Sequence, residues 1–228
     1  MWIYTLLGLI SGFFIPFIAG RFGKIIPADP GNLILNLWHR PRFSTVYDPA
    51  RTFLLKRLWC KLYIWAGFWA ICHAILFTFS YIIFPEQMRI YACFFIWIIN
   101  VCSVIDADYW LLPDFFTLPL LLLGFIFHTH VKLYDLSFAL TGATAGYFVS
   151  ILSVLVLAKS KNKELGGGDV KMITALGAWL GLMGLNICLI LSFFLFILFS
   201  WLPVQKKGAY GPALGTAALI VFFMMFSK

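Results

Sequence analysis

The sequence contains little charge. Of its 228 residues only 11% are charged and nine are Asp or Glu, whereas 62% are hydrophobic. A soluble domain of this size could not bury so much apolar surface, so lipid must cover it. The net charge is +8. Because the basic residues lie mainly between apolar runs, we interpret them as orientation signals in a membrane and expect no nucleic-acid partner.

The sequence also lacks the patterns of metal and disulfide sites. Its five cysteines are far apart, mostly inside apolar runs, and form no CxxC pair, and its four histidines form no ligand constellation. We therefore expect neither a metal site nor a disulfide framework. The first apolar run has no basic leader and no small-residue cleavage site, which predicts a retained helix rather than a signal peptide.

Long apolar runs predict an all-α integral membrane protein, a polytopic bundle of about eight transmembrane helices. We divide the chain into residues 1–61, a first membrane helix followed by a short basic loop, and residues 62–228, the main membrane-embedded domain. The expected spans are 2–19, 62–84, 90–105, 115–127, 136–158, 170–183, 185–202 and 212–226.

The distribution of Lys and Arg predicts the orientation of these spans. With an even number of spans, fourteen basic residues fall on the side of the 20–61 loop and three on the other side. Cytoplasmic segments carry such an excess, so this loop should be cytoplasmic and both chain termini should be periplasmic. The same arrangement puts Asp106, Asp108, Asp114 and Asp169 together on the cytoplasmic side.

These four acids form two clusters, and a charge at mid-bilayer costs at least about 2.5 to 3.5 kcal/mol. Asp106 follows an unbroken apolar run, so it should lie in the last helical turn. Asp114 follows Pro113 and Asp169 follows three glycines, so helix capping is an alternative explanation for both. For Asp106 and Asp108, the alternative is contact with interfacial water. If Asp106 and Asp169 face one another, the two carboxyl groups can share a proton and activate water against an amide.

The motifs around these acids resemble those of the type IV prepilin peptidases, membrane aspartic proteases with a GxGD signature. The first motif resembles residues 103–114, SVIDADYWLLPD; the GxGDxK motif matches residues 166–171, GGGDVK; and the F-G-P element resembles residues 210–212, YGP. The resemblance implies that Asp106 and Asp169 are the catalytic pair. It gives supporting roles to Asp108, Asp114, Gly166, Gly168 and Lys171. Lys171 could hold Asp169 ionised, bind substrate or simply be solvated.

The resemblance also implies a function. Such enzymes remove a short basic leader peptide from pilin or pseudopilin precursors at the cytoplasmic face of the bacterial inner membrane, and commonly methylate the new N-terminus with S-adenosylmethionine. Many members carry two CxxC pairs near the N-terminus, which this chain lacks. We therefore expect proteolysis without a cofactor, and a role for S-adenosylmethionine only if methyl transfer is retained. Precursors and membrane lipids are the expected partners.

Two other functions remain open at this point. An ion-coupled transporter subunit would also place acids between helices, with further polar groups at several depths. The sequence offers Asn100, Thr141, Thr144 and Asn186 as the main polar insertions and no acid in the middle of a span. A catalytically silent relative that acts as a pilus-assembly scaffold is the other alternative.

Overall fold

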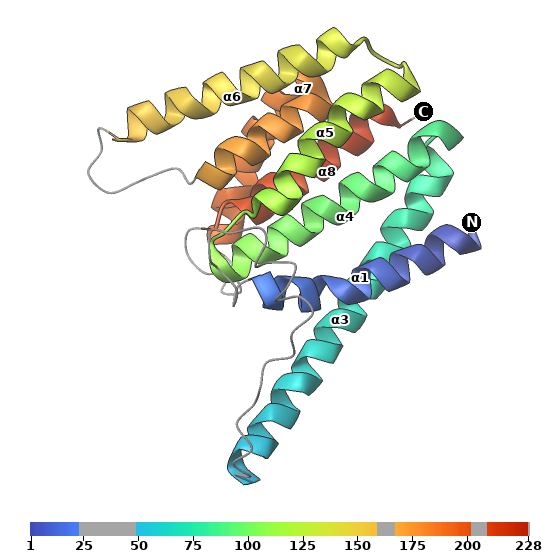
Figure 1. Cartoon of the computed structure of the whole chain (residues 1–228), viewed down its shortest axis with the longest axis vertical. Helices are drawn as coiled ribbons and strands as arrows, with labels where there is room; N and C mark the ends of the chain where they lie inside the picture. Colours follow the sequence, from blue (N-terminus) through green and yellow to red (C-terminus); the bar gives the residue numbers. More distant parts are fainter. Residues whose placement is uncertain (23–48, 159–166, 202–208, 228) are drawn as a thin grey trace. The chain divides into compact units, whose positions relative to one another are not determined.

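The computed structural model describes residues 1–22, 49–158, 167–201 and 209–227, and this part of the chain is helical throughout with no β-strand. The predicted all-α fold is confirmed (Figure 1). The helices are α1 (Trp2–Phe22), α3 (Pro49–Ile83), α4 (Glu86–Tyr109), α5 (Asp114–Val131), α6 (Leu136–Ala158), α7 (Gly167–Ser200) and α8 (Gly211–Phe226).

Six of these helices are long and apolar enough to cross a membrane, which makes the chain a multi-pass membrane protein. The seventh, α8, is apolar but has only 16 residues. α3 begins at Pro49, earlier than the span predicted from residue 62. Proline is suited to the first helical position because its missing N–H would have no partner there, so Pro49 starts the helix instead of interrupting it.

The described chain forms two compact units, Met1–Thr78 and Phe79–Lys228. In the first unit, α1 packs closely against α3. A Cβ on Gly8 would lie 2.5 Å from the backbone oxygen of His73, and Gly12 makes a similar contact with Trp69. Small residues allow membrane helices to approach in this way. The predicted domain boundary at residues 61 and 62 stays a prediction.

In the second unit, a buried aromatic core joins α4, α5, α7 and α8. Trp179 is fully buried, and its rings pack against those of Phe95, Phe127 and Phe222. The indole Nε1–H donates a hydrogen bond of 2.7 Å to the backbone oxygen of Leu120. This bond satisfies the one polar atom of the indole, which would be costly to bury alone.

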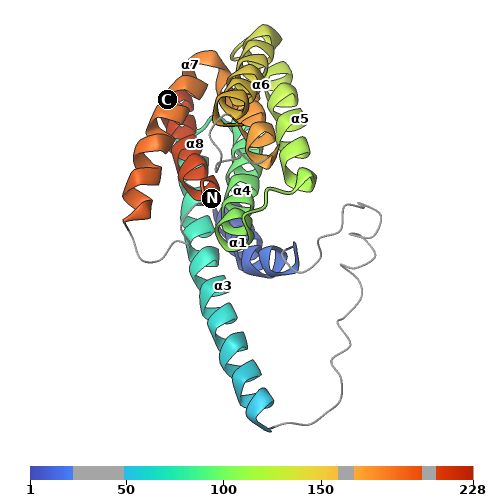
Figure 2. The same cartoon turned by 90° about the vertical axis from the view of Figure 1, so that its left-hand side faces the viewer.

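The helix α7 reverses direction at Gly181. Its 34 residues would span about 51 Å if straight, well beyond the hydrocarbon thickness. Gly181 has φ 62° and ψ −176°, a conformation that essentially only glycine adopts. Gly184 lies against Met225, near the end of α8, whereas Ser192 bonds to Tyr210, just before α8 begins. The second half therefore runs back along α8 (Figure 2).

The two halves of α7 correspond to the two spans predicted at residues 170–183 and 185–202. The sequence shows glycines at 177, 181 and 184, and any of them could have ended the first span. Only Gly181 among the described glycines has a positive φ, and its neighbour there is the ring of Phe138. Two features therefore place the reversal at Gly181: its backbone conformation and its packing against Phe138.

Substitution of Gly181 by Ala should destabilise the protein. The new Cβ would meet the Phe138 ring and would hold an L-residue in the glycine-only region, at a cost of about 1–3 kcal/mol. Thermal unfolding of the purified protein in detergent measures this effect. Gly67→Ala is the control, because a Cβ at this position of α3 meets open space. An unchanged unfolding temperature for Gly181→Ala would contradict this account of the reversal.

Candidate active site

The acidic motifs lie at one end of the second unit. There the end of α4 meets the starts of α5, α7 and α8 (left side of Figure 1). Three contacts join these elements: Asp106 with Gly211, Asp114 with Lys171, and Leu112 with Gly168. At the opposite end of the unit, aromatic rings near the end of α5 and the end of α8 pack together.

Asp106 occupies the last turn of α4 and is buried, with 7% of its surface exposed. Its Oδ2 accepts a hydrogen bond of 2.7 Å from the backbone N–H of Gly211. Gly211 is the first residue of α8, where backbone N–H groups have no partner within the helix and point towards an acceptor. The start of α8 therefore fixes the orientation of the Asp106 carboxyl group.

This hydrogen bond requires glycine at position 211. A Cβ there would lie 2.6 Å from Oδ2 and 2.7 Å from Cβ of Asp106. One turn further along α8, Gly215 contacts the hydroxyl of Ser103. That hydroxyl donates a hydrogen bond of 2.8 Å to the backbone oxygen of Ile99. Small side chains on both helices thus allow α8 to approach the acidic end of α4.

Sequence analysis had not assigned Gly211, Gly215 or Ser103 to the site. The resemblance of residues 210–212 to a family element marked the region without giving it a role. The spacing of Gly211 and Gly215, four residues apart, is the small-residue pattern of close helix contacts and was the available signal. Nothing in the sequence showed that Asp106 would be their neighbour.

Asp169 lies in the first turn of α7 and is partly exposed. Burial raises the pKa of the Tyr210 phenol above its ordinary value, and the nearby charge of Asp169 raises it further. Tyr210 directly precedes Gly211, the residue bonded to Asp106. Both acids of the predicted catalytic pair therefore lie at this end of the unit: Asp106 bonds to Gly211, and the contact of Gly168 with Leu112 places the start of α7, which carries Asp169, beside the connection that follows α4.

The glycines before Asp169 differ in their surroundings. A Cβ on Gly168 would lie 2.7 Å from Cβ of Leu112, in the connection between α4 and α5. The absence of a side chain at Gly168 thus lets the two motif segments touch. Gly167 faces open space. The supporting role predicted for Gly166 concerns a position outside the described residues.

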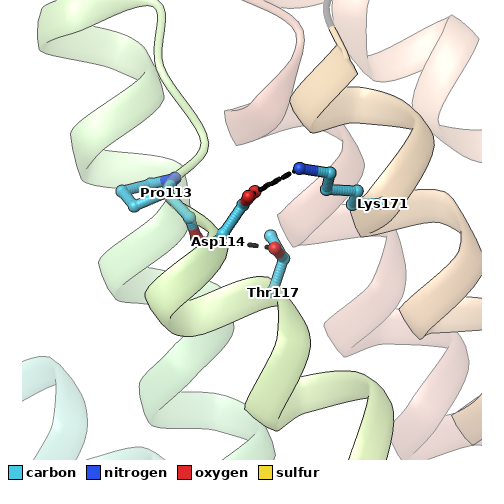
Figure 3. Close-up of polar contacts among 4 residues, drawn as sticks. All are labelled: Pro113, Asp114, Thr117 and Lys171. Carbon is cyan, nitrogen blue, oxygen red and sulfur yellow. Dashed lines mark hydrogen bonds and ion pairs between the residues drawn. The ribbon is translucent and has the colours of Figure 1, made fainter. Parts of the chain in front are cut away.

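Lys171 and Asp114 form an ion pair between α7 and α5 (Figure 3). The Lys171 Nζ lies 2.6 Å from each carboxylate oxygen of Asp114. Lys171 therefore pairs with Asp114. The sequence-based suggestion that it holds Asp169 ionised stays a prediction; residues two apart in a helix do not face each other.

Asp114 does not cap α5 through its side chain. The N-cap residue is Pro113, and no side-chain hydrogen bond caps this helix. Asp114 lies in the first turn, where a negative charge favours the helix dipole. In the same turn, the Thr117 hydroxyl donates a hydrogen bond of 3.5 Å to the Pro113 oxygen (Figure 3).

Asp108 differs from Asp106 although both lie in the last turn of α4. Its side chain is exposed, whereas that of Asp106 is buried. The two residues are two positions apart and so lie on different faces of the helix. Among the described residues, no group of three or more His, Cys, Asp or Glu side chains is arranged to bind a metal ion.

Comparison with known proteins agrees with the family resemblance of the motifs. Residues 93–201 match the model of the type IV leader peptidase family. The resemblance stated from the motifs is thereby confirmed. No solved structure matches the chain.

Curated relatives carry the name prepilin leader peptidase/N-methyltransferase. The chain is 39% identical over 124 residues to the one from Neisseria gonorrhoeae, covering 53% of this chain and 43% of the relative. It is 41% identical over 104 residues to the one from Escherichia coli K12, covering 45% and 44%. For the Klebsiella pneumoniae relative the identity is 42% over 94 residues, with 40% and 41% covered. The chain thus spans less than half the length of these relatives.

These bacterial relatives and the six apolar helices together indicate a multi-pass protein of the bacterial inner membrane. The matched region contains all four acids of the two motifs and ends at the last described residue of the α7 segment. It does not contain α8, although α8 supplies the backbone N–H that holds Asp106. The structure therefore adds one element to the site that the family match leaves out.

Loss of the ion pair should have a small, salt-dependent effect on stability. The side chains of Lys171 and Asp114 are 45% and 56% exposed, and pairs of this kind contribute about 0 to 1 kcal/mol. Lys171→Met should lower the free energy of unfolding by that amount at low salt and by nothing measurable near 1 M salt, where charges are screened within about 3 Å. Lys132→Met, for which the structure describes no ion pair, is the control. A loss of the same size at both salt concentrations would show that the charge is not the cause.

Proposed function

We propose that this chain is a membrane aspartic endopeptidase that removes the leader peptide from type IV prepilin-like precursors. The match of residues 93–201 to the leader peptidase family model and the names of the curated relatives support this activity. The observation that carries the proposal is that Asp106, at the end of α4, and Asp169, at the start of α7, lie at the same end of one unit, since an aspartic peptidase needs two carboxyl groups around one point.

In the proposed reaction, one carboxylate takes a proton from water and the other carboxyl group, protonated, polarises the scissile carbonyl. The Gly211 N–H donates its hydrogen bond to Oδ2 of Asp106. The other oxygen, Oδ1, then faces the reacting water. A fixed carboxyl group reduces the reorganisation needed when the water attacks.

The proposed substrate is a precursor with a short basic leader followed by an apolar helix. The apolar helix would lie in the bilayer beside the enzyme and bring the scissile bond to the level of Asp106 and Asp169. The exposed carboxylate of Asp108 at this end offers a negative charge to the basic leader. The strong excess of basic residues on one side of the chain supports a cytoplasmic position for the site and periplasmic termini.

The proposed proteolysis uses no cofactor, and we do not extend the proposal to methyl transfer. S-adenosylmethionine carries a charged amino-acid group, a sulfonium and an adenine, so it needs polar partners. A hollow of about 260 Å³ between α5 and α6 has Thr129 as its one polar lining residue beside Phe125, Ile126, Leu136 and Leu140. This apolar hollow does not suit the molecule.

Asp106→Asn and Asp169→Asn should each abolish cleavage of a model precursor, because neither asparagine can exchange the proton that the reaction moves. Cleavage is measured with the full-length protein in liposomes, and membrane accumulation of each variant is measured in parallel. Asp135→Asn, the same change in the loop between α5 and α6, should cleave at the wild-type rate.

Cleavage by either single variant at more than about a hundredth of the wild-type rate would contradict the role of the pair. A wild-type protein that does not cleave the precursor would favour the scaffold alternative. Proton flux driven by a solute in the same liposomes would favour the transporter alternative.

A further inference from the structure

A second polar side chain of α4, the hydroxyl of Ser103, reaches the start of α8. Its oxygen lies 2.8 Å from the backbone oxygen of Ile99, in its own helix, and 3.4 Å from the backbone oxygen of Gly211. Both neighbours are carbonyl groups, which only accept hydrogen bonds, so the single hydroxyl proton is shared between them. The shorter bond fixes the rotamer of Ser103, and the longer bond joins α4 to α8.

Gly211 is therefore held by α4 through both of its backbone polar groups. Its N–H donates to Asp106 at 2.7 Å, and its C=O accepts from Ser103. Ser103 and Asp106 are three residues apart, which places them on the same side of α4, one turn from each other. Both side chains are buried, so water competes little for these bonds.

In the described part of the chain, the start of α8 has no side-chain cap of its own. Its N-cap residue, Tyr210, makes no capping hydrogen bond and directs its hydroxyl to Ser192 on α7. The first N–H groups of a helix have no partner within the helix, so the direction of the Gly211 N–H is set by other elements. The two side chains of α4 supply this restraint, one on each side of Gly211.

The Ser103 hydroxyl also fills a space over Gly215, one turn further along α8. A Cβ on Gly215 would overlap the hydroxyl oxygen and would lie 3.1 Å from Cγ2 of Ile99. Removal of the hydroxyl therefore has two consequences. The bond to Gly211 is lost, and a gap is left over Gly215.

We propose that Ser103 is a positioning residue for Asp106. By holding the carbonyl of Gly211, its hydroxyl keeps the N–H of the same residue aligned with Oδ2 of Asp106. A carboxyl group that loses this alignment no longer presents its other oxygen to the reacting water, which slows the chemical step and leaves binding of the precursor unchanged. Ser103 exchanges no proton and acts through Gly211. This inference rests on the proposed peptidase function.

The first test compares Ser103→Ala with the wild type in the precursor cleavage assay. We expect kcat to fall about five- to tenfold, the loss typical of one hydrogen bond, with KM within about twofold. Ser80→Ala is the matched control and should cleave at the wild-type rate. Ser80 is also buried, but it lies near the end of α3, before α4 begins, whereas Asp106 lies in the last turn of α4.

A combined variant separates the hydrogen bond from packing. Gly215→Ala alone should lower the unfolding temperature in detergent, because its Cβ overlaps the Ser103 hydroxyl. When Ser103→Ala is added, the methyl group at position 215 fills the space that the hydroxyl leaves. The unfolding temperature should then rise above that of Gly215→Ala, whereas kcat should stay as low as in Ser103→Ala.

Ser103→Cys tests the same point with Gly215 unchanged. The sulfur takes the place of the oxygen but is a weak hydrogen-bond donor, so kcat should fall as in Ser103→Ala. This variant decides the question if the combined variant does not accumulate in the membrane.

The outcomes separate this inference from the proposed function. Wild-type kcat in Ser103→Ala, in Ser103→Cys or in the combined variant would overturn the role of the hydroxyl while the peptidase function stands. A raised KM with unchanged kcat would also overturn it, since Ser103 would then act on binding of the precursor. Absence of cleavage by the wild type would overturn the proposed function, and this inference with it.

Discussion

The hydrogen bond from the Gly211 N–H to Asp106 is the interaction on which the site depends. It places a buried carboxyl group against the positive end of a helix, which offsets part of the cost of burial. It also requires two helices to approach so closely that glycine is needed at positions 211 and 215. A carboxyl group with this single orientation is what distinguishes a site for chemistry from an acid that only meets interfacial water.

The first half of α7 supplies the second carboxyl group. Gly181 turns the helix back at the end of the unit opposite the acids, so that the second half returns along α8. The buried Trp179, two residues before the turn, bonds to α5 and packs against rings of α4, α5 and α8. The position of Asp169 is thus fixed from the far end of its helix by the core, and from the near end by the contact of Gly168 with Leu112.

Much of this architecture follows from the sequence. Long apolar runs predicted the helices, and the distribution of Lys and Arg predicted that the four acids share one end of the bundle. The pairing of Lys171 with Asp114 could not be predicted, because two acids lie within reach of such a lysine and only helix geometry separates them. The break in α7 was predicted to within a few residues, since three glycines compete and the choice depends on Phe138, which is remote in sequence.

The role of α8 is the largest addition that the structure makes. Its contact with Asp106 joins residues 105 positions apart, and no local pattern encodes such a contact. Tyr210 is a similar case, because its hydroxyl shares a hydrogen bond with Ser192 on another helix. Sequence motifs therefore identified the acids of the site, whereas the groups that orient those acids required the fold.

The most direct test of the account is the cleavage rate of Gly211→Ala with a prepilin-like precursor, measured beside Gly67→Ala. A Cβ at position 211 would lie 2.6 Å from Oδ2 of Asp106, whereas one at position 67 meets open space. The account predicts a rate at least about a hundredfold lower for Gly211→Ala, at wild-type accumulation in the membrane, because a misplaced group costs about that factor. Cleavage at the wild-type rate by this variant would contradict the central claim.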